Sequence, residues 1–164
     1  MNPLRDFFEG VTKGVVSGVS ERSDAPSPGD VVEACCRELG WRIDERPAAN
    51  KISLHFRDPR LGVRRVIVKA GSPEGMVAFT VYSAATLPAQ MVPADVLGYL
   101  LERNGKTLIT WQIQISGEGN VNFLLDHYAF AVGLRPGLFK WICDALVCEV
   151  QDFDDRLYKS GLLR

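Results

Sequence analysis

The 164 residues carry a net charge of −1, with 46% apolar and 24% charged side chains. That length suits one domain that buries about two thirds of its unfolded surface. A nearly neutral chain creates no global field that would attract nucleic acid or an anionic membrane. No apolar run approaches the roughly 18 residues of a membrane span, so none is expected.

Cysteine usage and the opening residues bear on the compartment. The four cysteines lie on predicted helices without metal-ligand spacing: Cys35, Cys36, Cys143 and Cys148. This placement predicts buried, reduced thiols and no bound metal or cofactor. The first 20 residues are broken by charges and glycines and lack a signal peptide's apolar block, which predicts a cytoplasmic protein.

Residues 1–27 are expected to form an N-terminal arm and linker. The arm has apolar residues at helical spacing: Leu4, Phe7, Phe8, Val11, Val15 and Val19. Glycines at 10, 14 and 18 weaken an isolated helix but allow another helix to approach closely. Two interpretations stay open, an amphipathic arm docked on its own chain or a neighbour, and a frayed terminal segment.

Residues 28–164 are expected to form a single domain that opens with a helix. Ser27 is a good N-cap, Pro28 suits the first helical position, and Asp30 places an acid in the first turn. Gly40 is expected to end this helix. Three strands are predicted next, over residues 51–57, 63–70 and 76–84, with Gly- and Pro-containing turns between them. A short helix over 93–104 follows.

The strongest hairpin signal is Gly117-Glu118-Gly119-Asn120, between two apolar-rich runs. In the first run, large apolar residues alternate with polar ones: Ile109, Trp111, Ile113 and Ile115. This alternation predicts one face in a core. The second run is apolar on both faces, with Val121, Phe123 and Leu125 on one and Leu124, Tyr128 and Phe130 on the other. A strand covered on both sides is therefore expected.

Pro136 is expected to start the longest helix, which keeps apolar residues at a spacing of 3.6 for about six turns. Its outer face is predicted to gather acids: Asp144, Glu149, Asp152, Asp154 and Asp155. The expected fold class is therefore α+β, with an antiparallel sheet packed with helices. The element order is helix, three strands, helix, two strands, long helix.

This order resembles the type III secretion chaperone fold. The stretch VLGYLLERNGK, the hairpin after it and LRPGLFKWICDAL resemble more particularly the YbjN-like proteins, bacterial regulators that share this fold. The sharpest part is the step Leu100-Leu101-Glu102-Arg103-Asn104, and the likeness covers roughly residues 28–158. The resemblance implies non-enzymatic protein binding, as a homodimer, and it supplies no catalytic residues.

The chain carries no pattern typical of catalysis. It lacks a P-loop, a G-x-S-x-G elbow, a C-x-x-C and a paired-histidine motif. Asp126-His127 with a helix cysteine is a weak candidate, because adjacent strand residues point to opposite faces. We therefore expect that the protein is not an enzyme.

Two hypotheses remain. The first is an adaptor or chaperone-like homodimer that holds an unidentified polypeptide on its sheet or beside the 93–104 helix, with these candidate contact residues: Leu97, Leu100, Leu101, Leu124, Tyr128 and Phe130. The alternative is a nucleic-acid-binding regulator that uses a basic ribbon over residues 51–70: Lys51, Arg57, Arg60, Arg64, Arg65 and Lys69. The absence of an exposed aromatic platform disfavours the alternative. The acidic face of the last helix is a natural partner for this ribbon.

Overall fold

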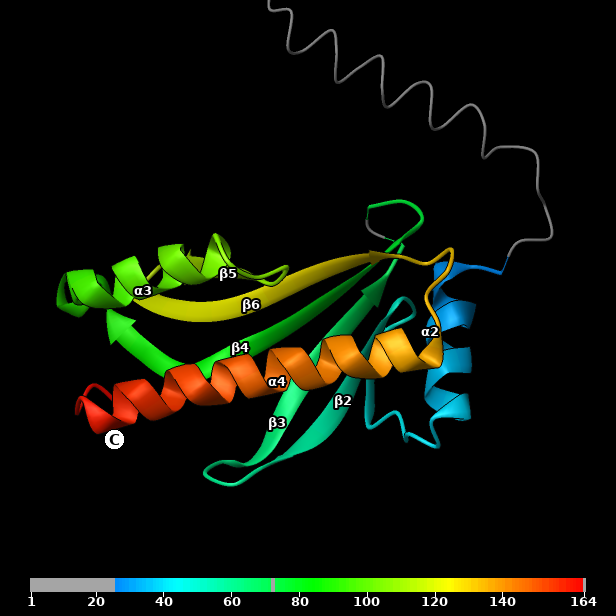
Figure 1. Cartoon of the computed structure of the whole chain (residues 1–164), viewed down its shortest axis with the longest axis horizontal. Helices are drawn as coiled ribbons and strands as arrows, with labels where there is room; N and C mark the ends of the chain where they lie inside the picture. The colour runs from blue at the N-terminus through cyan, green and yellow to red at the C-terminus, as the bar shows by residue number, and fades with distance from the viewer. Residues whose placement is uncertain (1–25, 72, 164) are drawn as a thin grey trace, which may run out of the picture.

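The computed structural model describes residues 26–71 and 73–163. Within these ranges, six antiparallel strands form one sheet in the order β1-β2-β3-β4-β6-β5, and α-helices pack on one of its faces (Figure 1). The predicted α+β class and the antiparallel sheet are confirmed. The predicted N-terminal arm lies, apart from its last two residues, outside the described residues.

The three predicted helices of the domain are present. They are α2 (Pro28–Glu38), α3 (Ala94–Asn104) and α4 (Pro136–Lys159). The predicted cap of α2 is a full capping box, in which Ser27 Oγ accepts from the Asp30 N–H at 3.2 Å and the Ser27 N–H donates to Asp30 Oδ2 at 3.0 Å. Gly40 follows α2 with φ 66°, a conformation that favours glycine after a helix.

The sheet contains one more strand than the sequence predicts. Its strands are β1 (Glu45–Ala48), β2 (Lys51–Asp58), β3 (Gly62–Ala70), β4 (Met76–Pro88), β5 (Thr110–Ile115) and β6 (Asn120–Phe130). The unpredicted β1 is only four residues long and contains Pro47, a residue confined to sheet edges. A short 3₁₀ turn, η1 (Ala89–Met91), follows β4. The pairing of β4 with β6 is irregular between Tyr82 and Thr86, where β4 bulges.

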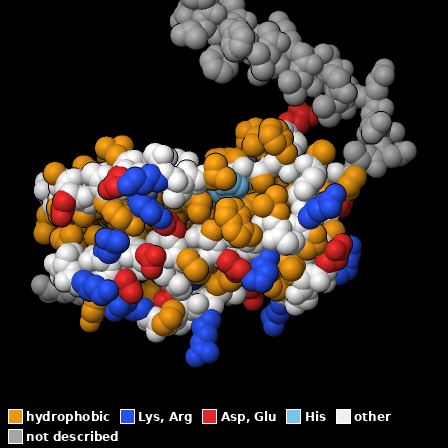
Figure 2. Space-filling view, viewed as in Figure 1, with side chains coloured by type: hydrophobic (Ala, Val, Ile, Leu, Met, Phe, Trp, Pro, Cys, Tyr) orange, Lys and Arg blue, Asp and Glu red, His pale blue; other side chains and the backbone are white. Residues whose placement is uncertain are grey.

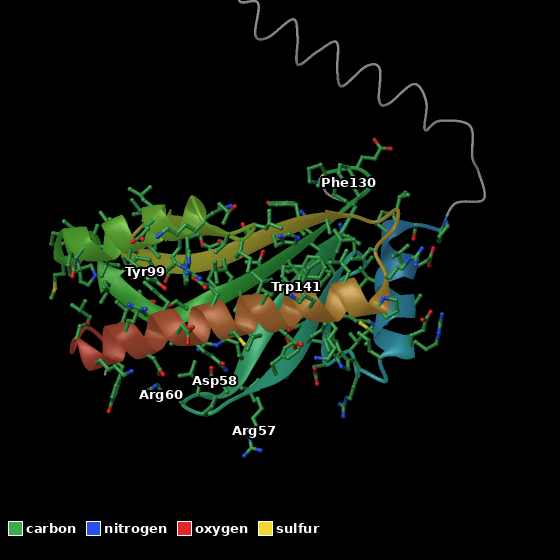
Figure 3. All side chains as sticks on the ribbon, in the orientation of Figure 1. Arg57, Asp58, Arg60, Tyr99, Phe130 and Trp141 are labelled. Carbon is green, nitrogen blue, oxygen red and sulfur yellow. The ribbon has the colours of Figure 1, made fainter. Side chains whose placement is uncertain are left out.

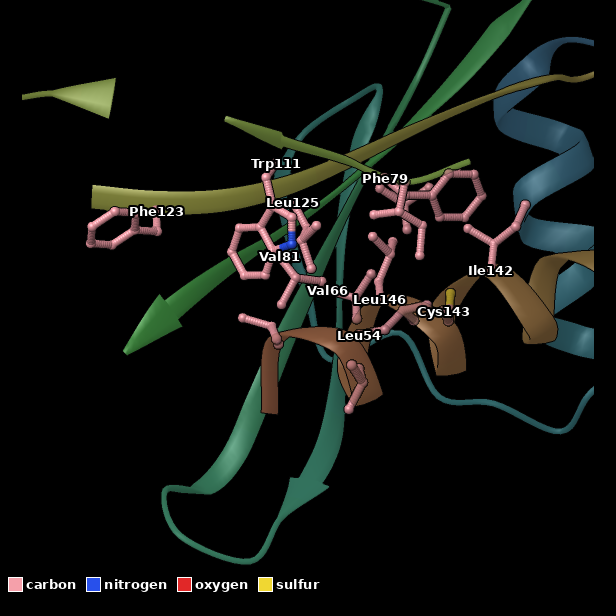
Figure 4. Packing of buried hydrophobic residues seen from close by; sticks show 14 of the residues in the cluster. Leu54, Val66, Phe79, Val81, Trp111, Phe123, Leu125, Ile142, Cys143 and Leu146 are labelled. Carbon is pink, nitrogen blue, oxygen red and sulfur yellow. The ribbon is translucent and has the colours of Figure 1, made fainter. Parts of the chain in front are cut away.

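The core lies between the sheet and α4, which crosses one face of the sheet with α2 near its start and α3 near its end (Figure 1). Buried side chains of five strands interlock there with those of α4 (Figure 4). Phe79 of β4 packs on Phe139 of α4 with ring centroids 5.4 Å apart, and Trp111 of β5 packs on Phe153 at 4.5 Å. Trp111 is 4% exposed, so its predicted place in the core is confirmed.

Two burial predictions for the central hairpin are wrong. Ile113 and Ile115 share the face of Trp111 but are 43% and 65% exposed, although their β6 partners Phe123 and Val121 are buried, because β5 is the edge strand of the sheet. The second face of β6 is covered only in part, since Tyr128 and Phe130 are 47% and 71% exposed. We call this second face, which no helix of the described ranges covers, the outer face of the sheet.

Candidate protein-binding surfaces

The outer face carries apolar side chains on β4 and β6, on both sides of the polar pair Thr80–Asp126. Register pairs Met76 with Phe130, Ala78 with Tyr128 and Tyr82 with Leu124, so all six side chains point to the same side. Tyr82, Tyr128 and Phe130 are exposed, whereas Leu124, which lies opposite Tyr82, is only 7% exposed. We call these six residues the outer patch. Of the predicted contact residues of β6, Tyr128 and Phe130 are exposed, whereas Leu124 is buried and offers little contact surface.

A buried carboxyl lies within this patch, between Leu124 and Tyr128 on β6. Asp126 is 8% exposed and accepts a hydrogen bond from the Thr80 hydroxyl at 2.6 Å across the strand pair. Burial raises the pKa of Asp126, and the bond from Thr80 opposes this effect without cancelling it. The patch is thus apolar except for one carboxyl that already has a partner, which suits a largely apolar binding partner.

The predicted contact residues of α3 divide between two sides of the helix. Leu97 and Leu101 lie one turn apart and are 38% and 72% exposed. Leu100 is 4% exposed and packs in the core, so the prediction that it contacts a partner is wrong. A helix that covers a core turns only some of its apolar positions outward, and the spacing of the three leucines alone does not show which.

Asn104, the last residue of the Leu-Leu-x-x-Asn step, forms hydrogen bonds with part of the edge of β5. Its side-chain amide donates to the Trp111 carbonyl at 3.0 Å, and its oxygen accepts from the Trp111 N–H at 2.6 Å. These two hydrogen bonds, which we call the Asn104 clamp, take the place of a neighbouring strand at Trp111. The N–H and C=O of Trp111 therefore point away from β6. In an antiparallel ladder this direction alternates from residue to residue, so the N–H and C=O groups of Ile113 and Ile115 also point away from β6.

The two edges of the sheet differ in their protection. The β1 edge is short and irregular in register, and it carries Pro47 and the charges of Glu45 and Arg46, all of which prevent edge pairing. The β5 edge, Thr110–Ile115, contains no charge and no proline. Beyond the Asn104 clamp, its outward backbone groups at Ile113 and Ile115 have no hydrogen-bond partner in the described part of the chain. We call these two residues the free edge.

The basic ribbon predicted over residues 51–70 does not form a basic surface. Arg64 is 4% exposed and lies in a buried cluster with Asp58 and Asp154, at 2.8 Å and 2.7 Å from its Nη2. Arg64 also donates to the Tyr82 carbonyl at 2.9 Å, and Asp154 accepts from the Ala84 N–H at 3.0 Å. The cluster ties the β2–β3 hairpin to the β4 bulge and α4. Its Arg64 is not available to a phosphate.

Two further arginines of the ribbon have acidic partners. Arg60 donates to Asp155 of α4 at 2.6 Å, and Arg65 donates to Glu45 of β1 at 2.9 Å. The prediction that acids of the last helix pair with the ribbon is confirmed for Asp154 and Asp155, although Asp154 and Glu149 are buried rather than on an outer face. Of the six ribbon residues, Lys51, Arg57 and Lys69 have no ion pair within the described ranges. The face that carries α4 likewise mixes charges of both signs without one large patch (Figure 2).

The candidate residues for chemistry are not brought together. Asp126 binds Thr80 on the outer face, whereas His127 Nδ1 lies 3.1 Å from the Leu108 carbonyl on the other face. Burial raises the pKa values of the Cys35, Cys36 and Cys143 thiols, that of Cys36 to about 11, so these thiols stay protonated at neutral pH. Cys148 is exposed, which corrects the expectation that all four are buried.

The largest hollows found among the described residues include open clefts. A cleft of about 400 Å³ lies beside the buried cluster, next to Asp58 and Arg60, below α4 in the view of Figure 3. Among its charged lining groups, Arg60 binds Asp155, and Arg64 binds Asp58 and Asp154. No group of His, Cys, Asp and Glu side chains suited to a metal ion occurs in residues 26–71 and 73–163. Among those residues, none of the helices has both the length and the apolar character of a membrane crossing.

The fold defines an α+β protein with one antiparallel sheet and helices on a single face. It is similar to the crystal structure of YbjN from E. coli, with a TM-score of 0.59 over 82% of this chain and 94% of that one, at 12% sequence identity. The similarity confirms the fold that the resemblance implied. No family model matches the chain, and no curated protein matches its sequence.

Proposed function

We propose that the protein is a non-enzymatic regulator that binds another polypeptide on the outer face of its sheet. The outer patch is the observation that carries this proposal. Tyr128 and Phe130 are exposed next to each other on this face of β6, and Tyr82 is exposed on the same face of β4, beyond the Thr80–Asp126 pair. Exposed tyrosine and phenylalanine are enriched where proteins contact one another, since each buries a large area with few rotatable bonds. The similar YbjN structure is described as that of a candidate transcription regulator, which fits a regulatory role.

The nucleic-acid alternative has weaker support. Three of the six ribbon residues are held by carboxylates, and one of these three is buried. Lys51, Arg57 and Lys69 remain, which is few for a phosphate-binding surface. A gel shift at increasing salt separates the two functions, because phosphate contacts give a steep salt dependence and apolar contacts do not.

The first expected result concerns capture of a partner. Tagged full-length protein is recovered from the cells that produce it, as wild type, as Tyr128→Ser and as Tyr158→Ser. Tyr158 of α4 is 49% exposed against 47% for Tyr128, so the two substitutions remove similar surface from opposite sides of the molecule. We expect a bound polypeptide to be lost with Tyr128→Ser and kept with Tyr158→Ser. Recovery of the same chains with all three proteins would contradict the proposal.

We also propose that the regulator is a homodimer formed through the free edge. Two copies of β5 can pair antiparallel about a two-fold axis at Gln114, which places Ile113 of one copy opposite Ile115 of the other. This register uses the outward backbone groups of both isoleucines and leaves the Asn104 clamp on Trp111 intact. It also brings four exposed isoleucines together on one face. An uncharged, self-complementary edge is the feature that supports this pairing.

The second expected result follows from the dimer. Light scattering at micromolar concentration should give twice the chain mass of 18.1 kDa. Ile113→Lys/Ile115→Lys should give the mass of one chain, because each lysine would face a lysine of the second copy. Val132→Lys, at a position 88% exposed and away from β5, is the control and should stay dimeric. A wild-type protein with the mass of one chain would remove the dimer and leave the outer-face proposal unaffected.

A further inference from the structure

Two lysines lie on the outer face in the same row as an exposed tyrosine of the outer patch. Lys51 of β2 is paired directly with Lys69 of β3, and Lys69 is paired in turn with Ala78 of β4. Directly paired residues point to the same side of a sheet, so the row continues through Ala78 to Tyr128 of β6. Lys69 is exposed and Lys51 is half-buried. We call these two residues the lysine pair.

The lysine pair has no acidic partner within the described ranges, unlike its neighbours on the same face. Arg65 donates to Glu45 of β1 at 2.9 Å, and the same carboxylate lies 3.6 Å from Nε2 of His55. At the lysine pair, β1 instead has Ala48 opposite Lys51. The short edge strand therefore neutralises one row of cations and leaves the next row charged.

The usual roles of lysine in a sheet do not explain this pair. Like charges directly opposite each other on neighbouring strands destabilise a sheet. Lysines protect sheet edges from pairing with other chains, but both β2 and β3 are interior strands. An anion bound between the two ammonium groups would remove their repulsion. The pair thus has the chemistry of a site for a carboxylate, or another anion, of a bound molecule.

The geometry of the sheet sets the distance between this anion site and the apolar contacts. Lys69 and Tyr128 lie two strands apart, which corresponds to roughly 10 Å between their backbones. An extended polypeptide covers that distance in about three residues. Asp126 lies next to Tyr128 on β6 and is already bound to Thr80, so acids of a partner are favoured over β3 rather than over β6.

We propose that the polypeptide bound on the outer face carries acidic residues close to apolar ones. Its acids bind the lysine pair, and its apolar side chains pack on Tyr128 and Phe130. This inference rests on the proposed function and adds the chemistry of the partner to it. A nucleic acid fits less well, because it carries a phosphate at every nucleotide, whereas few cations of this face lack an ion pair in the described ranges: Lys51, Arg57 and Lys69.

Selection from a library of random peptides displayed on phage, against the immobilised full-length protein, tests this inference. We expect the wild type to enrich peptides in which Asp or Glu lies a few positions from Phe, Tyr, Leu or Ile. Lys51→Glu/Lys69→Glu should enrich Lys and Arg at those positions instead. Lys51→Ala/Lys69→Ala, which also removes the repulsion within the pair, should lose the preference for acids without gaining one for bases.

The control variant is Lys140→Glu/Lys159→Glu, which makes the same change of charge on α4, on the other side of the sheet. It should keep the preference for acids. A synthetic copy of the most enriched peptide should bind Lys51→Glu/Lys69→Glu about tenfold more weakly than the wild type, because like charges replace two exposed ion pairs. The control should bind that peptide as the wild type does.

The outcomes separate this inference from the proposed function. A wild-type pool that matches the pool of Tyr128→Ser refutes the proposed function and, with it, the inference. A pool that depends on Tyr128 but has no excess of acids, or an excess that Lys51→Glu/Lys69→Glu leaves unchanged, refutes the inference alone.

Two other occupants of the lysine pair would also overturn the inference. Binding of labelled oligo(dT) to the wild type, abolished by Lys51→Glu/Lys69→Glu, would assign the pair to a nucleic acid. A wild-type dimer that Lys51→Glu/Lys69→Glu converts to the mass of one chain would assign it to a second copy of the protein.

Discussion

Trp111→Ala is expected to lower the free energy of unfolding by about 3–5 kcal/mol, because it leaves a large cavity in the core. Trp111 is 4% exposed, and its ring packs on that of Phe153 with centroids 4.5 Å apart. Its indole N–H also donates to Glu149 at 3.3 Å, and Glu149 in turn binds Arg103 of α3. The substitution therefore removes packing between β5 and α4 and leaves a buried acceptor with one donor fewer.

Trp141 provides the control for this measurement. It is the same residue type, it lies on α4, and it is 53% exposed (Figure 3). Trp141→Ala should cost less than about 1 kcal/mol, since little buried surface is lost. Both variants are measured by urea unfolding at one chain concentration, because a dimer makes stability depend on concentration. Losses of equal, small size would mean that Trp111 is not a core residue.

Most elements of this fold could be predicted because each is marked by local chemistry, whereas the four-residue strand β1 was missed. Ser27, Pro28 and Asp30 specify the start of α2, and alternation places Trp111 toward the core. The alternation of apolar and polar residues did not show at which residue of β5 burial in the core ends. Ile113 repeats the pattern of Trp111, but its exposure depends on how far α3 and α4 extend over the edge strand. That distance is a property of the assembled layers rather than of the strand.

The candidate surfaces were predictable only in part, for the same reason. The apolar second face of β6 is visible in the sequence at Tyr128 and Phe130, and the structure leaves it open. The run of arginines suggested a basic surface, whereas the fold brings Asp154 from a helix 90 residues further on into contact with Arg64. Asn104 stood out in the sequence as part of a motif, but its clamp on Trp111 requires the turn between α3 and β5.

Arg64→Leu is the second large effect that we expect, about 3–5 kcal/mol of destabilisation at neutral pH. Arg64 is the cation between Asp58 and Asp154, which are 3% and 2% exposed. Its removal leaves two buried carboxylates without a counter-charge and the Tyr82 carbonyl without this donor. Arg65→Leu is the matched control, because Arg65 is the next residue and its side chain is 55% exposed in its pair with Glu45. That variant should lose less than about 1 kcal/mol.

The pH dependence distinguishes a lost ion pair from lost packing. In the wild type, burial raises the pKa of Asp58, but the Leu61 and Arg60 N–H groups and Arg64 outweigh it and hold the pKa at about 2, against 3.8. Because folding lowers its pKa, Asp58 contributes about 2 kcal/mol to the free energy of unfolding above pH 3.8, and this contribution is lost as the pH falls toward 2.

In Arg64→Leu the Asp58 carboxyl lacks the guanidinium and binds a proton at higher pH, which relieves its buried charge. The difference in unfolding free energy between wild type and Arg64→Leu should therefore shrink from pH 7 to pH 4. A difference that stays constant over this range would show that Arg64 acts through packing alone.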